Sequence, residues 1–330
     1  MPWIRFLLSA AVVVFAAIKL AEYGDIIAVR TRLGGVFVGT IFLAGATSLP
    51  ELLTSISAFR AGVPDLAAGN FFGSNMVNML LLALVDLINY QVPLLRRIAI
   101  SHALTAALTT VLMLIAIISI MADVNLMLGW MGVDSLLLIF LYFWGVWLIQ
   151  RENNSGVQVE GVSMEPAEGF PTLRKGVLGF AGTAVLLILV VPQLVQASNE
   201  IAAITGLGSG FVGTALLSLV TSLPELLAAL AAMRINAFDM AVGNLFGSSV
   251  FNMLALGIAD VFYLNGRFLG DIDPDFALVG LLGLLLINMA LVGNLARVER
   301  KVLFVELDTL AILITYLLGM YLLFLRGIGA

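Results

Sequence analysis

The sequence predicts an all-α membrane protein with ten transmembrane helices in two inverted five-helix repeats. Three observations lead to this fold class. Of the 330 residues, 61% are hydrophobic and only 11% are charged, whereas about a quarter of an average soluble domain is charged. The apolar stretches are about 20 residues long, the length of a membrane-spanning helix, and two parts of the chain repeat each other. With a net charge of −5 and no basic block, the chain is not a soluble domain, a disordered chain or a nucleic-acid-binding protein.

The predicted spans follow from the positions of the apolar stretches, at roughly 30 residues per span and turn. They cover residues 3–22, 34–60, 65–89, 94–121, 124–150, 172–198, 208–235, 239–264, 275–296 and 302–325. The first span resembles a signal peptide, but its length and the lack of a small-residue cleavage site favour a retained helix. Residues 151–171 are polar, acidic and rich in Gly and Pro, as expected of a linker. We therefore expect an N-terminal half over 1–150, a cytoplasmic linker over 151–171 and a C-terminal half over 172–330.

The distribution of Lys and Arg predicts the orientation. With the N-terminus outside, twelve basic residues lie at inner ends and loops, and only Arg5, Arg60, Arg267 and Arg326 lie outside. Cytoplasmic loops are enriched in Lys and Arg, so this orientation is favoured, and ten spans place the C-terminus outside as well. We expect a monomeric, multi-pass protein of a prokaryotic plasma (inner) membrane.

An internal repeat is the most informative feature of the chain. Residues 39–86 align with residues 213–260 without a gap, and 24 of the 48 positions are identical. TSLPELL occurs at 47–53 and again at 221–227, and GNFFGSNMVNML at 69–80 matches GNLFGSSVFNML at 243–254. Each half has an odd number of spans, so the second copy crosses the membrane in the opposite direction. Inverted repeats are typical of secondary transporters, which bind their substrate where the repeats meet near the membrane midplane.

Each repeat has a proline in the middle of a predicted span. Pro50 and Pro224 lack an N–H, which releases the carbonyls of Ala46 and Val220 from the helical hydrogen-bond ladder. A free carbonyl is costly in lipid, so it must face protein, water or an ion. For the prolines alone, a simple helix kink is the favoured interpretation.

A glutamate follows each proline and favours a functional interpretation. Glu51 and Glu225 occupy equivalent positions of the two repeats, and an ionisable group in the middle of the membrane costs roughly 3 kcal/mol or more unless it has a role. Hydroxyl side chains precede each glutamate by three and four residues, which places them on the same helix face: Thr47, Ser48, Thr221 and Ser222. Carboxylate, hydroxyl and carbonyl oxygens are the ligands that Ca²⁺ and Na⁺ prefer.

A second polar stripe recurs every four residues in the next span of each repeat. It consists of Asn70, Ser74 and Asn78 in the first copy and of Asn244, Ser248 and Asn252 in the second. The alternative role for these side chains is hydrogen bonding between helices. Small residues accompany each stripe and allow a neighbouring backbone to approach closely: Gly69 and Gly73, then Gly243 and Gly247.

The two copies of G-T-…-T-S-L-P-E followed by G-N-…-G-S-…-N resemble the alpha repeats of the cation/calcium antiporter superfamily, most closely its sodium/calcium exchanger branch of ten-helix prokaryotic type. The resemblance covers nearly the whole chain. It implies that Glu51 and Glu225 bind both Ca²⁺ and Na⁺, and that Asn78 and Asn252 line the centre of the site. It further implies backbone carbonyl ligands for Ca²⁺ at Thr47 and Thr221, backbone carbonyl ligands for Na⁺ at Ala44 and Ser218, and hydroxyl ligands for Na⁺ at Ser48, Ser74, Ser222 and Ser248.

The chain departs from the family pattern in two places. Many relatives have Gly where this chain has Ala46 and Val220, and many have an Asp at one of the two central amide positions, which are both Asn here. The site therefore has two carboxylates, whose charge one Ca²⁺, two Na⁺ or two protons would neutralise. We expect Na⁺/Ca²⁺ antiport by alternating access, without a cofactor. The alternatives are antiport of Ca²⁺ against H⁺, antiport of another divalent cation, and a Ca²⁺-binding homologue that does not transport. Nothing in the sequence supports an enzyme.

Overall fold

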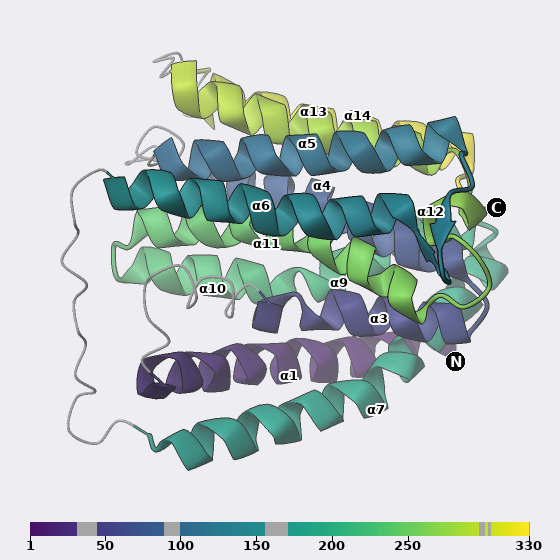
Figure 1. Cartoon of the computed structure of the whole chain (residues 1–330), viewed down its shortest axis with the longest axis horizontal. Coiled ribbons are helices and arrows are strands. Elements are labelled where there is room, and N and C mark those ends of the chain that lie inside the picture. Colours follow the sequence, from purple (N-terminus) through teal and green to yellow (C-terminus); the bar gives the residue numbers. More distant parts are fainter. Residues whose placement is uncertain (32–44, 89–99, 156–170, 297–300, 303–304, 330) are drawn as a thin grey trace.

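A computed structural model describes residues 1–31, 45–88, 100–155, 171–296, 301–302 and 305–329. Long helices run side by side in one bundle, and both chain termini lie at the same end of it (Figure 1). The helical elements are α1 (Pro2–Thr31), α3 (Leu49–Arg60), α4 (Pro64–Ile88), α5 (Ile100–Ala122), α6 (Val133–Ser155), α7 (Leu173–Thr205), α8 (Ser209–Val212), the π-helical η1 (Gly213–Leu217), α9 (Ser218–Thr221), α10 (Leu223–Arg234), α11 (Phe238–Ala259), the 3₁₀-helical η2 (Asp260–Phe262), α12 (Phe268–Asp271), α13 (Phe276–Ala296) and α14 (Leu307–Arg326).

The predicted membrane fold is confirmed. Within the described residues, nine helical segments are long and apolar enough to cross a membrane. The remaining predicted span, 34–60, is represented by α3 and the turn before it, because its residues 34–44 lie outside the described part. The division of the chain at 151–171 stays a prediction, since α6 ends at Ser155, α7 begins at Leu173 and residues 156–170 lie outside the described part.

The two repeats run in opposite directions. The short connection from α3 to α4 lies at the end of the bundle that carries the termini, whereas the connection from α10 to α11 lies at the other end (Figure 1). Helices α4 and α11, which follow the two connections, occupy the interior, and most residues of both are buried. The equivalent segments of the repeats therefore meet in the centre of the protein.

Two predicted spans begin later than expected, each after a short antiparallel hairpin. The strands β1 (Met127–Leu128) and β2 (Met131–Gly132) precede α6, and β3 (Lys301–Val302) and β4 (Val305–Glu306) precede α14. In the first hairpin the turn contains Gly129 at φ +68°, a conformation that favours glycine. Hydropathy does not distinguish this apolar hairpin from the start of a helix.

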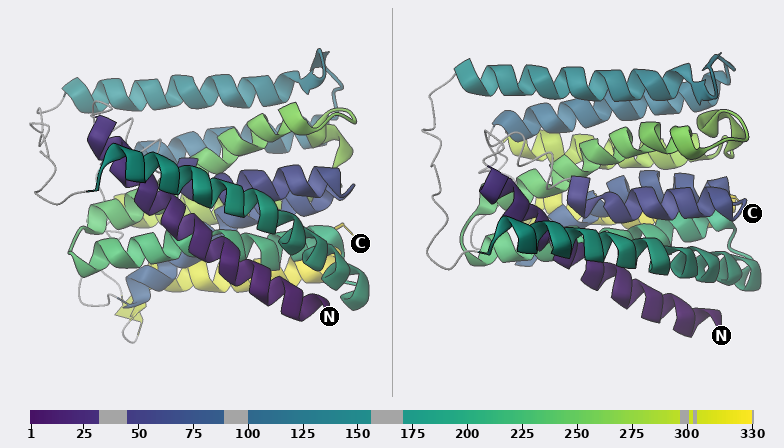
Figure 2. Two further views of the ribbon diagram at one scale, coloured as in Figure 1. Left: turned by 90° about the horizontal axis from the view of Figure 1, so that it is seen from below. Right: turned by 60° about the horizontal axis from the view of Figure 1, so that its bottom comes forward.

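Helices α1 and α7 are longer than predicted, at 30 and 33 residues. They lie next to each other and cross the remaining helices obliquely (Figure 2). A tilted helix needs more residues to span the same thickness, so both extend beyond the apolar stretch that predicted them. α1 packs mainly on α7 and touches the rest of the protein much less.

Candidate cation site

Both TSLPE segments interrupt their helices at the same residue. Ser48 (φ −91°, ψ 7°) and Ser222 (φ −90°, ψ 0°) leave the helical conformation in the same way. The Leu-Pro pair that follows each serine forms the first turn of α3 or α10, where a proline costs no hydrogen bond. In the second repeat the chain before the break is the π-helical η1 and then α9. Each predicted span is thus two helical pieces that meet at a serine.

Glu51 and Glu225 lie in the first turns of α3 and α10 and are only 1% exposed. The positive end of a helix dipole favours a carboxylate at this position. Within the described residues, neither carboxyl forms an ion pair with Lys or Arg. The two carboxyls are close enough to interact electrostatically with each other. Two buried carboxylates without a basic partner are stable only if a cation or protons neutralise their charge.

Hydroxyls of the opposite repeat approach each carboxyl. Thr221 lies near Glu51, and its equivalent Thr47 lies near Glu225, to which Ser248 of the same repeat is also close. Within the described residues, Oε2 of Glu51 and both carboxylate oxygens of Glu225 nevertheless lack a hydrogen bond of ordinary geometry. The crossed arrangement means that the two repeats build one shared site.

Further oxygen atoms in this region are buried and have no hydrogen-bond partner among the residues that the structure describes. They are Oγ of Ser48, Ser222 and Ser248, and Oδ1 of Asn78 and Asn252. Buried polar atoms are hydrogen-bonded in almost all native structures, so a group of exceptions in one region indicates a ligand. Because these atoms are hard oxygen acceptors, the ligand they suit is a hard cation such as Ca²⁺ or Na⁺. The described residues contain no cluster of three or more His, Cys, Asp and Glu side chains that could hold a metal ion.

Asn70 and Asn244 hold the breaks against the central helices. The Asn70 amide donates to Oγ1 of Thr54 at 2.8 Å and to the Glu51 carbonyl at 3.4 Å, and its Oδ1 accepts from Thr221 at 3.1 Å. Asn244 donates to the Glu225 carbonyl at 3.2 Å. These contacts fit the alternative role considered for the polar stripe, hydrogen bonding between helices.

The remaining predicted ligands are Ser74, Ser218 and Ala44, and they differ in whether their oxygen atoms are available to a cation. Oγ of Ser74 lies 3.5 Å from Oγ1 of Thr221, at the junction of the two repeats. The carbonyl of Ser218 already accepts the Ser222 N–H at 3.0 Å and the Thr221 hydroxyl at 3.3 Å, so a Na⁺ ligand there would compete with existing bonds. Ala44 lies outside the described residues.

Two polar residues of the site were not predicted from the sequence. Asn75 and Ser249 are fully buried and form hydrogen bonds to the predicted Asn252 and Asn78. The signal that could have found them is their position three residues before Asn78 and Asn252, which places each on the same side of its helix.

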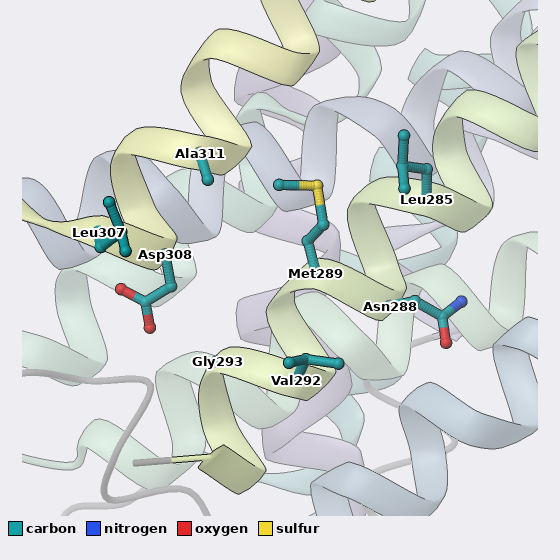
Figure 3. A pocket seen from close by; sticks show the side chains of 8 residues that line it. All are labelled: Leu285, Asn288, Met289, Val292, Gly293, Leu307, Asp308 and Ala311. Atoms are coloured by element: carbon teal, nitrogen blue, oxygen red, sulfur yellow. The ribbon is translucent and has the colours of Figure 1, made fainter. Parts of the chain in front are cut away.

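A pocket of about 400 Å^3 lies away from the cation site, between α13 and α14 (Figure 3). It is lined by Leu285, Asn288, Met289, Val292, Gly293, Leu307, Asp308 and Ala311. Its lining is mostly apolar, and Leu285, Val292 and Leu307 are 45–61% exposed. None of the predicted cation ligands lines it, so it has no part in the site described above.

Inverted repeats that meet at paired, buried carboxylates are typical of secondary transporters of cations. The sequence pattern of the family described as "Sodium/calcium exchanger protein" matches residues 1–149 and 175–327. The chain therefore belongs to the sodium/calcium exchanger protein family, and it is a membrane antiporter of the cation/calcium class.

Individual relatives support this assignment. The chain is 27% identical to the "Putative antiporter CaxA" of Alkalimonas amylolytica over 304 residues, which cover 89% of this chain and 91% of the relative. Among solved structures, it is similar to the H⁺/Ca²⁺ exchanger CAX, with a TM-score of 0.75, 17% identity and coverage of 99% of this chain and 85% of the other. It is also similar to the sodium-calcium exchanger NCX_Mj, with a TM-score of 0.57, 19% identity and 97% coverage of both chains. At these identities the two structures support the fold alone.

Proposed function

We propose that the protein exchanges Ca²⁺ for Na⁺ across the membrane by alternating access. The observation that carries this proposal is the pair Glu51 and Glu225, buried at the two helix breaks. Within the described part of the chain the pair has no basic partner, and the oxygen atoms around it have no hydrogen bond. Ca²⁺ is held by both carboxylates and by the backbone carbonyls of Thr47 and Thr221. Na⁺ occupies flanking positions that use the hydroxyls of Ser48, Ser74, Ser222 and Ser248 and the carbonyls of Ala44 and Ser218. Asn78 and Asn252 line the centre.

The charge of the site explains why exchange is obligatory. Two ionised carboxylates leave an empty site at −2, which is costly to enclose in a low-dielectric interior. One Ca²⁺ removes this charge, as do two Na⁺, whereas three Na⁺ would leave +1 and make exchange electrogenic. Only the loaded protein therefore changes its access. The membrane is the prokaryotic plasma (inner) membrane, with both termini outside, which agrees with the location of both termini at one end of the bundle.

A second candidate is exchange of Ca²⁺ for protons. The observation that favours it is the absence of a third acidic side chain from the site in the described part of the chain. Two protons neutralise two carboxyls without any further ligand.

Ca²⁺ uptake into proteoliposomes tests the proposal. Vesicles loaded with Na⁺ are diluted into Na⁺-free buffer that contains radioactive Ca²⁺, and a parallel set carries a pH gradient in place of the Na⁺ gradient. We expect uptake that requires internal Na⁺ and that is lost in Glu51→Gln and in Glu225→Gln. Glu22→Gln is the matched control, because Glu22 is 52% exposed and pairs with Lys19 on the surface. Uptake driven only by the pH gradient would mean that the protein exchanges Ca²⁺ for H⁺ and not for Na⁺. Ca²⁺ binding without counterflow of either ion would refute antiport.

A further inference from the structure

Helices α4 and α11 are joined by two hydrogen bonds that are related by the internal repeat. Nδ2 of Asn78 donates to Oγ of Ser249 at 3.2 Å, and Nδ2 of Asn252 donates to Oδ1 of Asn75 at 3.2 Å. Positions 78 and 252 are equivalent in the repeat, as are positions 75 and 249. The same contact is therefore made twice, with the two halves exchanged, and all four side chains are at most 1% exposed.

The partner of Asn78 determines how its carboxamide is turned. The Ser249 hydroxyl has a single proton, which it donates to the carbonyl of Leu245 at 2.9 Å. Toward Asn78 it can therefore only accept, so Asn78 must present its NH₂ group. This assignment follows from the number of protons and does not depend on telling nitrogen from oxygen in the amide. Oδ1 of Asn78 is left buried, with no hydrogen-bond partner among the described residues.

The partner of Asn252 imposes no such choice. Asn75 is itself an amide and can offer either a carbonyl oxygen or an NH₂ group. Its Nδ2 has no hydrogen-bond partner in the described part of the chain. If both amides turn over together, the hydrogen bond between them is kept with donor and acceptor exchanged. The carboxamide of Asn252 can then face the site with its oxygen or with its NH₂ group.

We propose that Ser249 is a positioning residue that holds the oxygen of Asn78 toward the cation site, and that Asn75 leaves the equivalent Asn252 free to turn. This inference rests on the proposed function, since it assigns a role to the central amides of the same site. Asn78 lies one helical turn after Ser74, which contacts the junction of the two repeats. A carbonyl oxygen there attracts a cation, whereas an NH₂ group repels it. The two halves of the site thus hold cations unequally.

Substitutions at Ser249 test the first half of the proposal by Ca²⁺ uptake under the driving gradient. Ser249→Ala removes the acceptor, so Asn78 can turn its NH₂ group inward, and we expect the apparent KM for Ca²⁺ to rise about fivefold with little change in maximal rate. Ser249→Thr keeps the hydroxyl and should restore the wild-type KM. Ser198→Ala on α7 is the matched control, because Ser198 is also fully buried and donates to a carbonyl four residues back at 2.9 Å, but forms no hydrogen bond to another described helix.

Asn75→Ser tests the second half. It places at position 75 the residue that the other repeat has at 249, and thereby fixes Asn252 with its oxygen inward. We expect the apparent KM for Ca²⁺ to fall about twofold to threefold, an effect that a purely structural role of Asn75 does not explain. This variant keeps the proposal testable even if Ser249→Ala fails to fold.

The outcomes separate the inference from the function on which it rests. Normal uptake by the wild type, together with an unchanged KM in Ser249→Ala and in Asn75→Ser, overturns the inference alone. A raised KM in Ser249→Ala that Ser249→Thr does not restore also overturns it, since the hydroxyl is then not the cause. Wild-type vesicles that take up no Ca²⁺ under either gradient refute the proposed function and the inference with it.

Discussion

Gly73 allows the first repeat to contact the second at its helix break. A Cβ at this position would lie 2.6 Å from the carbonyl oxygen and 2.7 Å from Cα of Thr214, and 3.0 Å from Oγ of Ser218. Two of these three atoms belong to the backbone, which cannot turn aside as a side chain can. To reach an ordinary contact distance of 3.4 Å, α4 and η1 must separate by roughly 0.8 Å.

We expect Gly73→Ala to destabilise the protein by about 1–2 kcal/mol. Overpacking of this kind costs about 1–3 kcal/mol, and the better helix propensity of Ala returns up to about 1 kcal/mol. The separation also acts on the site. It pulls Ser74 away from Thr221, which lies 3.5 Å from it, and Thr221 away from Asn70, at 3.1 Å. We therefore expect about tenfold slower Ca²⁺ uptake at low Ca²⁺ concentration, since small misplacements of binding groups are costly.

Thermal unfolding in detergent and Ca²⁺ uptake into vesicles measure the two effects separately. The control is Gly182→Ala on α7, an exposed helical position where an added Cβ meets no atom within 4 Å. That variant gains helix propensity without a clash and should unfold at the same temperature as the wild type or a higher one. If Gly73→Ala matches Gly182→Ala in both assays, the close approach of α4 to η1 is not required and the reasoning is wrong.

Two further predictions concern ion pairs outside the site. The side chains of Arg267 and Asp134 are 5% and 9% exposed and pair at 3.0 Å, so Arg267→Gln should lower the free energy of unfolding by about 3–5 kcal/mol. Arg5→Gln, in a pair whose side chains are 40% and 36% exposed, should lower it by under about 1 kcal/mol, and similar losses for the two variants in denaturant unfolding would contradict this. The hydrogen bonds from Arg326, at 2.9 and 3.1 Å, lower the pKa of Asp275 below its ordinary value of 3.8. Their contribution is therefore present above pH 3.8 and is lost as the pH falls through the lowered pKa. The melting temperature of Arg326→Gln should lie slightly below that of the wild type at pH 7 and match it in acid, and a gap that persists in acid would contradict this.

The sequence was sufficient to predict those parts of the fold that depend on the bilayer and on local chemistry. The apolar stretches predict the spans because a helix must cross a fixed thickness. The prolines predict the breaks at Ser48 and Ser222 because a proline inside a span removes a backbone hydrogen bond. The opposite directions of the two repeats follow from the odd number of spans that the sequence predicts for each half.

The parts that the sequence did not predict depend on how helices pack. The pairing of Asn78 with Ser249 requires the relative position of α4 and α11, which no local pattern contains. The glycines also show that the sequence does not predict which residues a helix packs against. Gly69 and Gly73 contact the backbone of the other repeat as expected. Gly243, the equivalent of Gly69, instead packs against the ring of His102. Equal sequence positions in the two repeats therefore have unequal neighbours.

Packing also bears on which part of the protein moves. α1 lies mainly on α7 and only lightly on the rest, and the salt bridge between Arg5 and Glu200 joins the two at 2.8 Å. We therefore predict that α1 and α7 move together as one unit during exchange.

A disulfide between α1 and α7 tests this prediction. A Cβ at Gly176 would lie 3.3 Å from Cβ of Ile26, a few tenths of an ångström below the range of about 3.5–4.5 Å seen in disulfides. Cysteine at position 26 lacks the Cγ2 atom that makes the closest contact, and the chain has no cysteine of its own, so Ile26→Cys with Gly176→Cys introduces the only two thiols. If the helices move as one unit, the oxidised double variant should exchange Ca²⁺ at the same rate before and after reduction, as should each single variant. Exchange that stops on oxidation and returns on reduction would mean that α1 and α7 slide past each other, since a covalent link between them blocks only a motion that changes their contact.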